Sequence, residues 1–222
     1  MRGKLIVIDG GDGSGKTKQT ELLVARGAKE GLPFGTLSYP RYEKKTGIVV
    51  KAYLNGEFGP PLDIPAEKAS MLYAVDRWAS FMEGDFSPLE RGVNMIANRY
   101  SGSNMGHQGS KIDDSAKRTA FFKWNDALEH EFFGIPRPDL NIVLHVPADI
   151  SISLIDGRGN AKDGHENVEH LRRAEATYLE LAGSFPGFVL IECVRDGKLM
   201  PAEEIHELVW AEVSKVLTVQ PT

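Results

Sequence analysis

A glycine-rich loop follows the first apolar run of the chain. Residues 5–8 (LIVI) lead into residues 10–17 (GGDGSGKT), which match the phosphate-loop pattern G-x-x-x-x-G-K-[ST] at every fixed position. Glycines let backbone N–H groups turn inward around an anion, and the helix that follows adds the positive end of its dipole. The residues predicted to hold the phosphates of ATP or GTP are Gly10, Gly11, Asp12, Gly13, Ser14, Gly15, Lys16 and Thr17.

Two side chains of this loop carry chemistry of their own. Lys16 is expected to reach the β- and γ-phosphates, and the Thr17 hydroxyl is expected to coordinate Mg²⁺. The alternative is a glycine-rich turn without a ligand. It is disfavoured because an apolar run, the loop and a helical pattern occur in the required order.

The length and charge of the chain restrict what it can be. Its 222 residues are enough for one α/β domain with a sizeable core. A net charge of −5 without a long basic run argues against nucleic acid as the main partner. The single cysteine, Cys193, cannot form an internal disulfide, and no apolar run approaches the ~18 residues of a membrane span. We therefore expect a cytoplasmic protein that contacts neither nucleic acid nor a membrane.

Five short apolar runs are predicted to be strands. They are near-continuous rather than alternating, which is typical of a parallel sheet that helices cover on both faces. Amphipathic segments between the runs would supply those helices. The sequence predicts a single α/β domain, 1–222, with a doubly wound five-stranded parallel sheet of the P-loop NTPase type. The strands are expected at 5–8, 35–39, 92–97, 140–146 and 188–193.

Apolar residues repeat at helical spacing in several predicted helices. The helices are expected at about 17–31, 65–82, 113–132, 167–182 and 201–217. The stripe of the last helix is expected to face inward, whereas the other two could be core or a surface on which a second copy packs. The stripes consist of Met71, Val75, Trp78 and Met82, of Phe121, Trp124, Leu128 and Phe132, and of Ile205, Leu208, Val209, Val213 and Val216.

Tyr73 and Arg77 lie four residues apart, hence on one face of the second predicted helix. An aromatic ring can stack on a nucleobase, and a guanidinium can donate to base carbonyls or to a phosphate. The alternative is a surface tyrosine beside a solvated arginine, and the pair taken alone favours this alternative.

A polar, glycine-containing stretch follows the strand predicted at 92–97. Ligands of open α/β sheets bind beyond the carboxyl ends of the strands, so polar residues there are well placed to read a second small molecule. Arginine suits a phosphate, and asparagine and glutamine suit the edge of a base. The alternative is an ordinary polar loop. The candidate residues are Arg99, Ser103, Asn104, His107 and Gln108.

The segment at about 157–166 is polar and glycine-rich and contains Arg158. Such a composition suits a small lid that closes over transferring phosphates and brings an arginine with it. A solvated surface loop is the alternative.

Taken together, these residues resemble the thymidylate kinase family, which makes dTDP from dTMP and ATP. Residues 9–17 resemble its E-G-x-D-G-x-G-K-[ST] loop, and residues 72–77 (LYAVDR) resemble its L-F-A-A-D-R segment. Residues 98–109 are similar to D-R-Y…S…A-Y-Q-G, and residues 138–140 to P-D-L. The ordered set is far more specific than the loop alone, and the similarity covers most of the chain.

The resemblance implies a role for each matching residue. The implied roles are Asp12 near the acceptor sugar and phosphate, Tyr73 stacked on thymine, Arg77 on the base or its phosphate, Arg99 on the acceptor phosphate, and Asn104 and Gln108 lining the pocket with Ser103 and His107. It also implies Mg²⁺ as cofactor and a homodimer packed through helices.

Three positions depart from the family pattern. Asn98 replaces an aspartate, so any metal role there passes to Asp12, because a neutral amide binds Mg²⁺ weakly. His107 replaces a tyrosine, and the family's discrimination against ribonucleotides is therefore not carried over. Arg41, within Pro-Arg-Tyr in place of the usual R-E-P-G-G, is expected to reach the acceptor phosphate.

The expected reaction is transfer of the ATP γ-phosphoryl group to dTMP, a step in dTTP biosynthesis. Some family members carry the catalytic arginine at the position of Gly13, and others supply it from the lid. Because this chain has a glycine there, Arg158 of the lid is the expected catalytic arginine. Lys16, Arg99 and Asp12 are the other expected catalytic residues. Thr17 and Asp12 are the expected metal ligands. Two alternatives stay open: a kinase of another deoxynucleotide or nucleoside, and a nucleotide-dependent switch without enzymatic activity.

Overall fold

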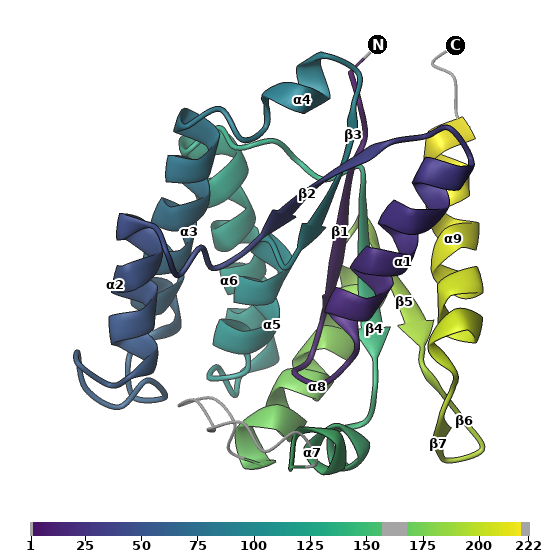
Figure 1. The fold of residues 1–222 in the computed structure, drawn as a ribbon. Coiled ribbons are helices and arrows are strands. Elements are labelled where there is room, and N and C mark those ends of the chain that lie inside the picture. Colours follow the sequence, from purple (N-terminus) through teal and green to yellow (C-terminus); the bar gives the residue numbers. More distant parts are fainter. Residues whose placement is uncertain (1, 157–167, 219–222) are drawn as a thin grey trace.

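A five-stranded parallel sheet forms the centre of the protein, in the order β2-β3-β1-β4-β5 (Figure 1). The computed structural model describes residues 2–156 and 168–218. Helices flank the sheet on both sides, so the predicted doubly wound α/β fold is confirmed. All five predicted strands are present: β1 (Leu5–Gly10), β2 (Phe34–Ser38), β3 (Asn94–Asn98), β4 (Leu140–His145) and β5 (Phe188–Glu192).

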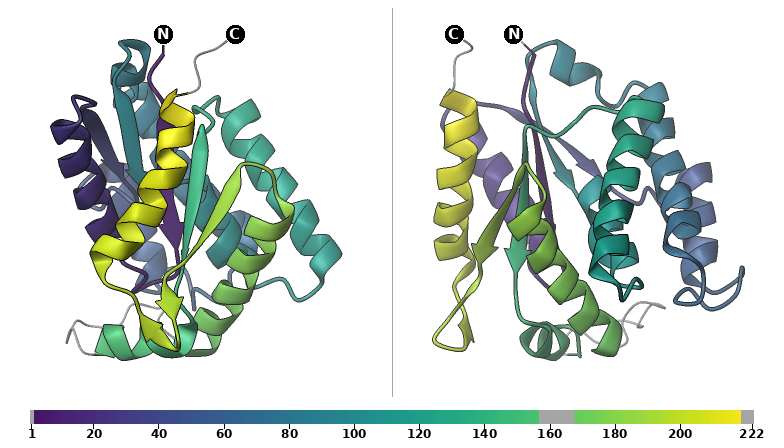
Figure 2. Two further views of the ribbon diagram at one scale, coloured as in Figure 1. Left: turned by 90° about the vertical axis from the view of Figure 1, so that its right-hand side faces the viewer. Right: turned by 180° about the vertical axis from the view of Figure 1, so that it is seen from behind.

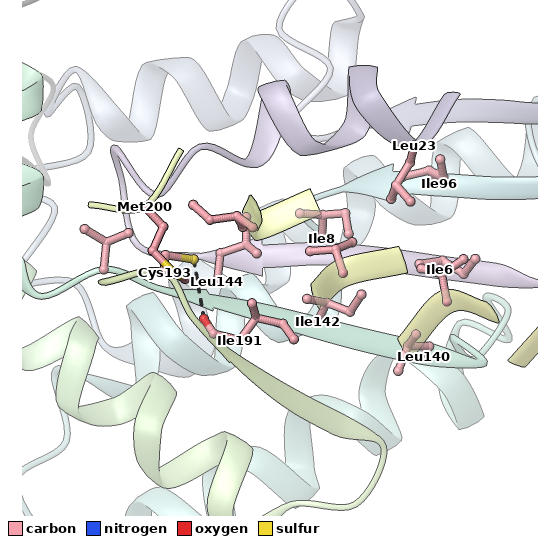
Figure 3. Packing of buried hydrophobic residues seen from close by; sticks show 14 residues of the cluster. Ile6, Ile8, Leu23, Ile96, Leu140, Ile142, Leu144, Ile191, Cys193 and Met200 are labelled. Atoms are coloured by element: carbon pink, nitrogen blue, oxygen red, sulfur yellow. Dashed lines mark hydrogen bonds between the residues drawn. The ribbon is translucent and has the colours of Figure 1, made fainter. Parts of the chain in front are cut away.

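The central strand β1 is buried along its whole length. Because side chains alternate across a strand, its residues enter two different cores. Ile6 and Ile8 pack with Leu23 and Val209 on the face covered by α1 (Lys16–Lys29) and α9 (Ala202–Thr218); Figure 3 shows this cluster. Leu5 and Val7 enter a second cluster on the opposite face. Packing on both faces holds β1 in place, so the phosphate loop begins at a rigid strand.

The remaining helices lie on the other side of the sheet or at one of its two ends (Figure 2). Within the described residues they are α2 (Lys45–Leu54), α3 (Ala66–Met82), α4 (Ser87–Glu90), α5 (Ser101–Gly109), α6 (Ser115–Ala127), η1 (Leu128–Phe132), α7 (Ala148–Asp156) and α8 (Val168–Ser184), and a short hairpin joins β6 (Val194–Arg195) to β7 (Lys198–Leu199). None of the helices in residues 2–156 and 168–218 is both long and apolar enough to cross a membrane.

Helix α5 occupies the polar, glycine-containing stretch after β3, where the sequence analysis predicted no helix. Its glycines obscure the helix in the sequence because glycine is a poor helix former. A Cβ on Gly106 would lie 2.3 Å from the Tyr178 ring of α8, and one on Gly102 would lie 2.9 Å from Oδ2 of Asp9. The glycines therefore allow α5 to approach β1 and α8 closely.

The apolar stripes of the helices differ in how far they are buried. The apolar stripe of α3 is exposed: Met71 is 49% exposed, and Met82 is 65% exposed. The buried face of α3 instead contains small and polar residues, among them Ala74, Ser80 and Arg77. The prediction that Leu208 of α9 faces inward is wrong, because this side chain is 41% exposed. Phe132, whose stripe was left open as core or surface, is 80% exposed. Helical spacing identifies an apolar face but not what covers it.

We predict that Gly106→Ala lowers the free energy of unfolding by about 1–3 kcal/mol, because the new methyl group overlaps the Tyr178 ring. Gly183→Ala in α8 is the matched control, since no atom lies within 4 Å of its added Cβ. There we expect a gain of roughly 0.5–1 kcal/mol from helix propensity. Urea unfolding of both variants tests this, and a stable Gly106→Ala protein would contradict the close approach of α5 and α8.

Candidate active site

The phosphate loop lies between β1 and α1, at the carboxyl edge of the sheet (Figure 1). Gly13 and Gly15 have φ of 79° and 87°, in the left-handed region that favours glycine. Lys16 opens α1, and its Nζ donates to the carbonyl oxygens of Gly11 at 2.8 Å and Gly10 at 3.2 Å. The side chain thus lies across the loop, where an incoming phosphate would replace the carbonyl oxygens as its partner.

Two cavities meet at this edge. The larger, of about 940 Å³ including its open mouth, is lined by the loop residues Gly13, Lys16 and Thr17. The second, of about 530 Å³, opens beside it, and both are bordered by Asp12, Tyr39 and Arg99. The second cavity is lined by every predicted acceptor residue except Arg41: Tyr73, Arg77, Arg99, Ser103, Asn104, His107 and Gln108, together with Pro40, Tyr42 and Leu54.

Arg99 stands where the cavities meet. It has φ of 65° although it is not a glycine, a backbone conformation that costs about 1–3 kcal/mol. Its guanidinium forms an ion pair with Asp12, and its Nη1 lies 3.0 Å from Nε2 of His107. Burial alone would lower the pKa of Arg99, but the Asp12 carboxylate raises it overall, so the guanidinium stays charged. A fixed cation therefore faces both cavities.

A buried carboxylate holds one of the residues that line the acceptor cavity, Arg77. Glu129 of η1 is fully buried and receives two hydrogen bonds from Arg77, Nε–Oε2 at 2.5 Å and Nη2–Oε1 at 2.7 Å. Burial would lower the pKa of Arg77, but attraction to Glu129 raises it overall. The sequence analysis missed Glu129. Its spacing could have indicated its place: Glu129 lies four residues after Asn125 and eight after Phe121, hence on the same helix face, which is buried.

Asp9 at the end of β1 links the loop to α5 and α8. Its Oδ1 accepts from the hydroxyls of Ser103 at 2.6 Å and Tyr178 at 2.9 Å, and from the backbone N–H of Gly10 at 3.0 Å. The Ser103 hydroxyl therefore supports the site through Asp9, although Ser103 also lines the acceptor cavity.

Tyr73 lines the acceptor cavity from α3. Its ring packs edge-on against Tyr53 of α2, with ring centroids 6.0 Å apart and an interplanar angle of 82°. Tyr39 fixes another wall, because its hydroxyl donates to Oγ of Ser80 at 2.8 Å. The sequence analysis assigned Tyr39 only to the strand predicted at 35–39 and missed its place in the site. The cavity thus combines aromatic walls with polar groups at its base.

The neighbourhood of Thr17 contains both predicted metal ligands. Thr17 is exposed and lines the larger cavity with Asp12. The Asn98 amide donates to Oγ1 of Thr17 at 3.2 Å. The Asp12 carboxylate already has Arg99 as a partner. Arg158 and the predicted lid, 157–166, lie outside the described residues.

Arg41 does not line the acceptor cavity and forms ion pairs elsewhere. Its backbone N–H and Nε donate to the buried Asp76 at 2.8 and 3.2 Å, and its Nη1 lies 3.0 Å from Glu83 and 3.1 Å from Asp85. The structure therefore does not bring Arg41 together with the other predicted substrate residues. Its position instead stabilises the segment between β2 and α2.

Comparison with known proteins decides the family. The family model described as thymidylate kinase matches residues 8–200. The chain belongs to the thymidylate kinase family. It is 28% identical to a probable thymidylate kinase of Pyrococcus abyssi over 98% of both chains, and 31% identical to the thymidylate kinase of Mycobacterium tuberculosis over 80% of this chain and 85% of that one. The fold matches that of Candida albicans thymidylate kinase with a TM-score of 0.74, at 20% identity and over 100% and 96% of the two chains.

Membership of the thymidylate kinase family makes the protein a phosphotransferase. A non-enzymatic switch, one of the alternatives from the sequence, is therefore excluded. The two adjoining cavities are what a thymidylate kinase requires, since it must hold two nucleotides at once.

We predict that Arg41→Met lowers the free energy of unfolding by about 3–5 kcal/mol, because Asp76, 1% exposed, loses its cationic partner. Lys44→Met is the control, since Lys44 pairs with the same Glu83 at the surface and we expect little change. Thermal and urea unfolding measure both. If Arg41→Met kept full stability but raised the KM for the acceptor, Arg41 would be a phosphate ligand after all.

Proposed function

We propose that the protein transfers the γ-phosphoryl group of ATP to the 5′-phosphate of dTMP, forming dTDP and ADP in the supply of dTTP. The observation that carries this proposal is the meeting of two cavities at Asp12, Tyr39 and Arg99 in a chain of the thymidylate kinase family. The donor occupies the phosphate-loop cavity and the acceptor occupies the cavity beside it. Their phosphates then meet next to Arg99.

The donor is held by backbone groups more than by side chains. The N–H groups of residues 10–17 and the N-terminus of α1 bind the β- and γ-phosphates, and Lys16 moves from the carbonyls of Gly10 and Gly11 onto them. ATP is the donor that the family resemblance favours.

The acceptor is held at both ends. Arg99 binds its 5′-phosphate, while the thymine ring stacks on Tyr73. Asn104 and Arg77, which are almost fully buried and line the cavity, read the base, and His107 and Gln108 flank the sugar. The Asp12 carboxylate keeps the Arg99 guanidinium oriented towards the junction.

Catalysis in this arrangement is positioning and charge stabilisation. The acceptor phosphate is already an anion, so no strong general base is needed. Lys16, Arg99 and Arg158 neutralise the charge that develops on the transferring group. A catalytic arginine of this type contributes a factor of ~10³ or more to the rate. Arg158 is assigned this role on its sequence position alone.

The residues around Thr17 fit Mg²⁺. The Thr17 hydroxyl and Asp12 carboxylate oxygens line one cavity, and Mg²⁺ uses few protein ligands because it keeps several waters and binds substrate phosphates. When bound, the ion neutralises charge on the β- and γ-phosphate oxygens. Thr17 and Asp12 would hold it, and the Asn98 amide positions the Thr17 hydroxyl.

The exposed stripe of α3 supports a homodimer. Met71, Val75, Trp78 and Met82 leave an apolar helix face open to solvent, beside the exposed Ile48 and Val49 of α2. Both helices lie at the outer side of the molecule, away from the sheet (Figure 1). A second copy related by a two-fold axis covers such a face with the same face of its own. The family resemblance implies this partner as well.

A nucleotide panel tests the proposed function. We predict that ADP release from ATP and Mg²⁺ is fastest with dTMP and falls with dCMP, dGMP, dAMP and thymidine. Tyr73→Ala should raise the KM for dTMP by about tenfold with little change in the KM for ATP, because only the base loses its stacking surface. A wild-type protein that releases ADP at the same rate with and without dTMP would contradict the proposal.

A further inference from the structure

Glu129 gathers hydrogen-bond donors from three helical elements. Besides both bonds from Arg77 of α3, its Oε1 accepts from the side-chain amides of Asn104 of α5 and Asn125 of α6, each at 3.2 Å. The carboxylate is 0% exposed, so these groups replace water entirely. Loss of these hydrogen bonds would leave a buried charge without partners, at a high cost in free energy. All three donors are therefore held in place.

These contacts leave the Nη1 group of Arg77 for a ligand. Its Nε and Nη2 both donate to Glu129, so Nη1 is the nitrogen not engaged by this carboxylate. Arg77 lines the acceptor cavity. A guanidinium nitrogen can only donate, so Arg77 presents a hydrogen-bond donor there.

The contacts also fix which way the Asn104 amide faces. Its Nδ2 donates to Oε1 of Glu129 and to the backbone carbonyl of Ser70, both at 3.2 Å. Both partners are acceptors only, so a flipped amide would set oxygen against oxygen. The Oδ1 of Asn104 is therefore the atom left for the cavity that Asn104 lines, and it can only accept.

We propose that Glu129 is a positioning residue that sets base specificity by fixing a donor on Arg77 beside an acceptor on Asn104. This inference rests on the proposed function. The pair complements the O4 and N3–H of thymine or uracil. Cytosine offers the reverse pattern, an amino donor at position 4 and an acceptor at N3. Its donor would face the Arg77 donor, and its acceptor would face the Asn104 acceptor. Glu129 does not touch the nucleotide and acts through the two side chains that do.

The test is the ratio of kcat/KM for dTMP to that for dCMP in wild type, Glu129→Gln and Glu131→Gln. A glutamine places one N–H group against a donor in either orientation, so Arg77 loses its fixed orientation and the Asn104 amide is free to flip. We expect the ratio to fall about 10- to 100-fold, mainly through a higher KM for dTMP, with the KM for ATP within about twofold. Glu131, 70% exposed on the same helical turn, is the matched control and should leave the ratio unchanged.

Each outcome decides the proposal. A folded Glu129→Gln protein with an unchanged ratio overturns it. If that variant does not fold, Glu129→Asp is measured instead, because it keeps the charge but is too short to reach both Arg77 and Asn104. An unchanged ratio in Glu129→Asp likewise overturns the proposal. If neither folds, wild type that uses dCMP as well as dTMP overturns it, and strong preference for dTMP supports it. Wild type that does not phosphorylate dTMP overturns the proposed function instead.

Discussion

The ion pair between Arg99 and Asp12 borders both cavities, and the proposed arrangement of two nucleotides depends on it. Two polyanions repel each other, so a cation has to be fixed between them. Arg99 reaches that place only because its backbone adopts a left-handed conformation directly after β3. The parallel sheet brings the ends of β1 and β3 side by side, which places the phosphate loop and Arg99 within reach of each other.

Buried carboxylates hold the rest of the site in position. Asp9 joins the loop to α5 and α8, Asp76 anchors the segment after β2 through Arg41, and Glu129 joins α3, α5 and α6. Each is almost completely inaccessible to water, so each requires its donors in one arrangement. The side chains proposed to touch substrate are thereby oriented before substrate binds, which reduces the cost of ordering them later.

Much of this could be predicted from the sequence, and the failures have physical causes. The strand–loop–helix unit around Lys16 is predictable because glycine spacing and an apolar run encode it locally. Helix α5 was missed because its glycines serve close packing against Tyr178, a contact 72 residues away (178 − 106). Glu129 was missed because its partners come from other elements. The α3 stripe was identified, but periodicity does not tell a core face from an exposed one.

A crystal structure with dTMP, Mg²⁺ and a non-hydrolysable ATP analogue tests the central claim most directly. The account predicts the analogue's terminal phosphate on the loop at Lys16, the dTMP phosphate within hydrogen-bond distance of Arg99, and thymine on the Tyr73 ring. Thymine bound away from Tyr73, or the two nucleotides bound with their phosphates apart and neither phosphate near Arg99, would contradict it.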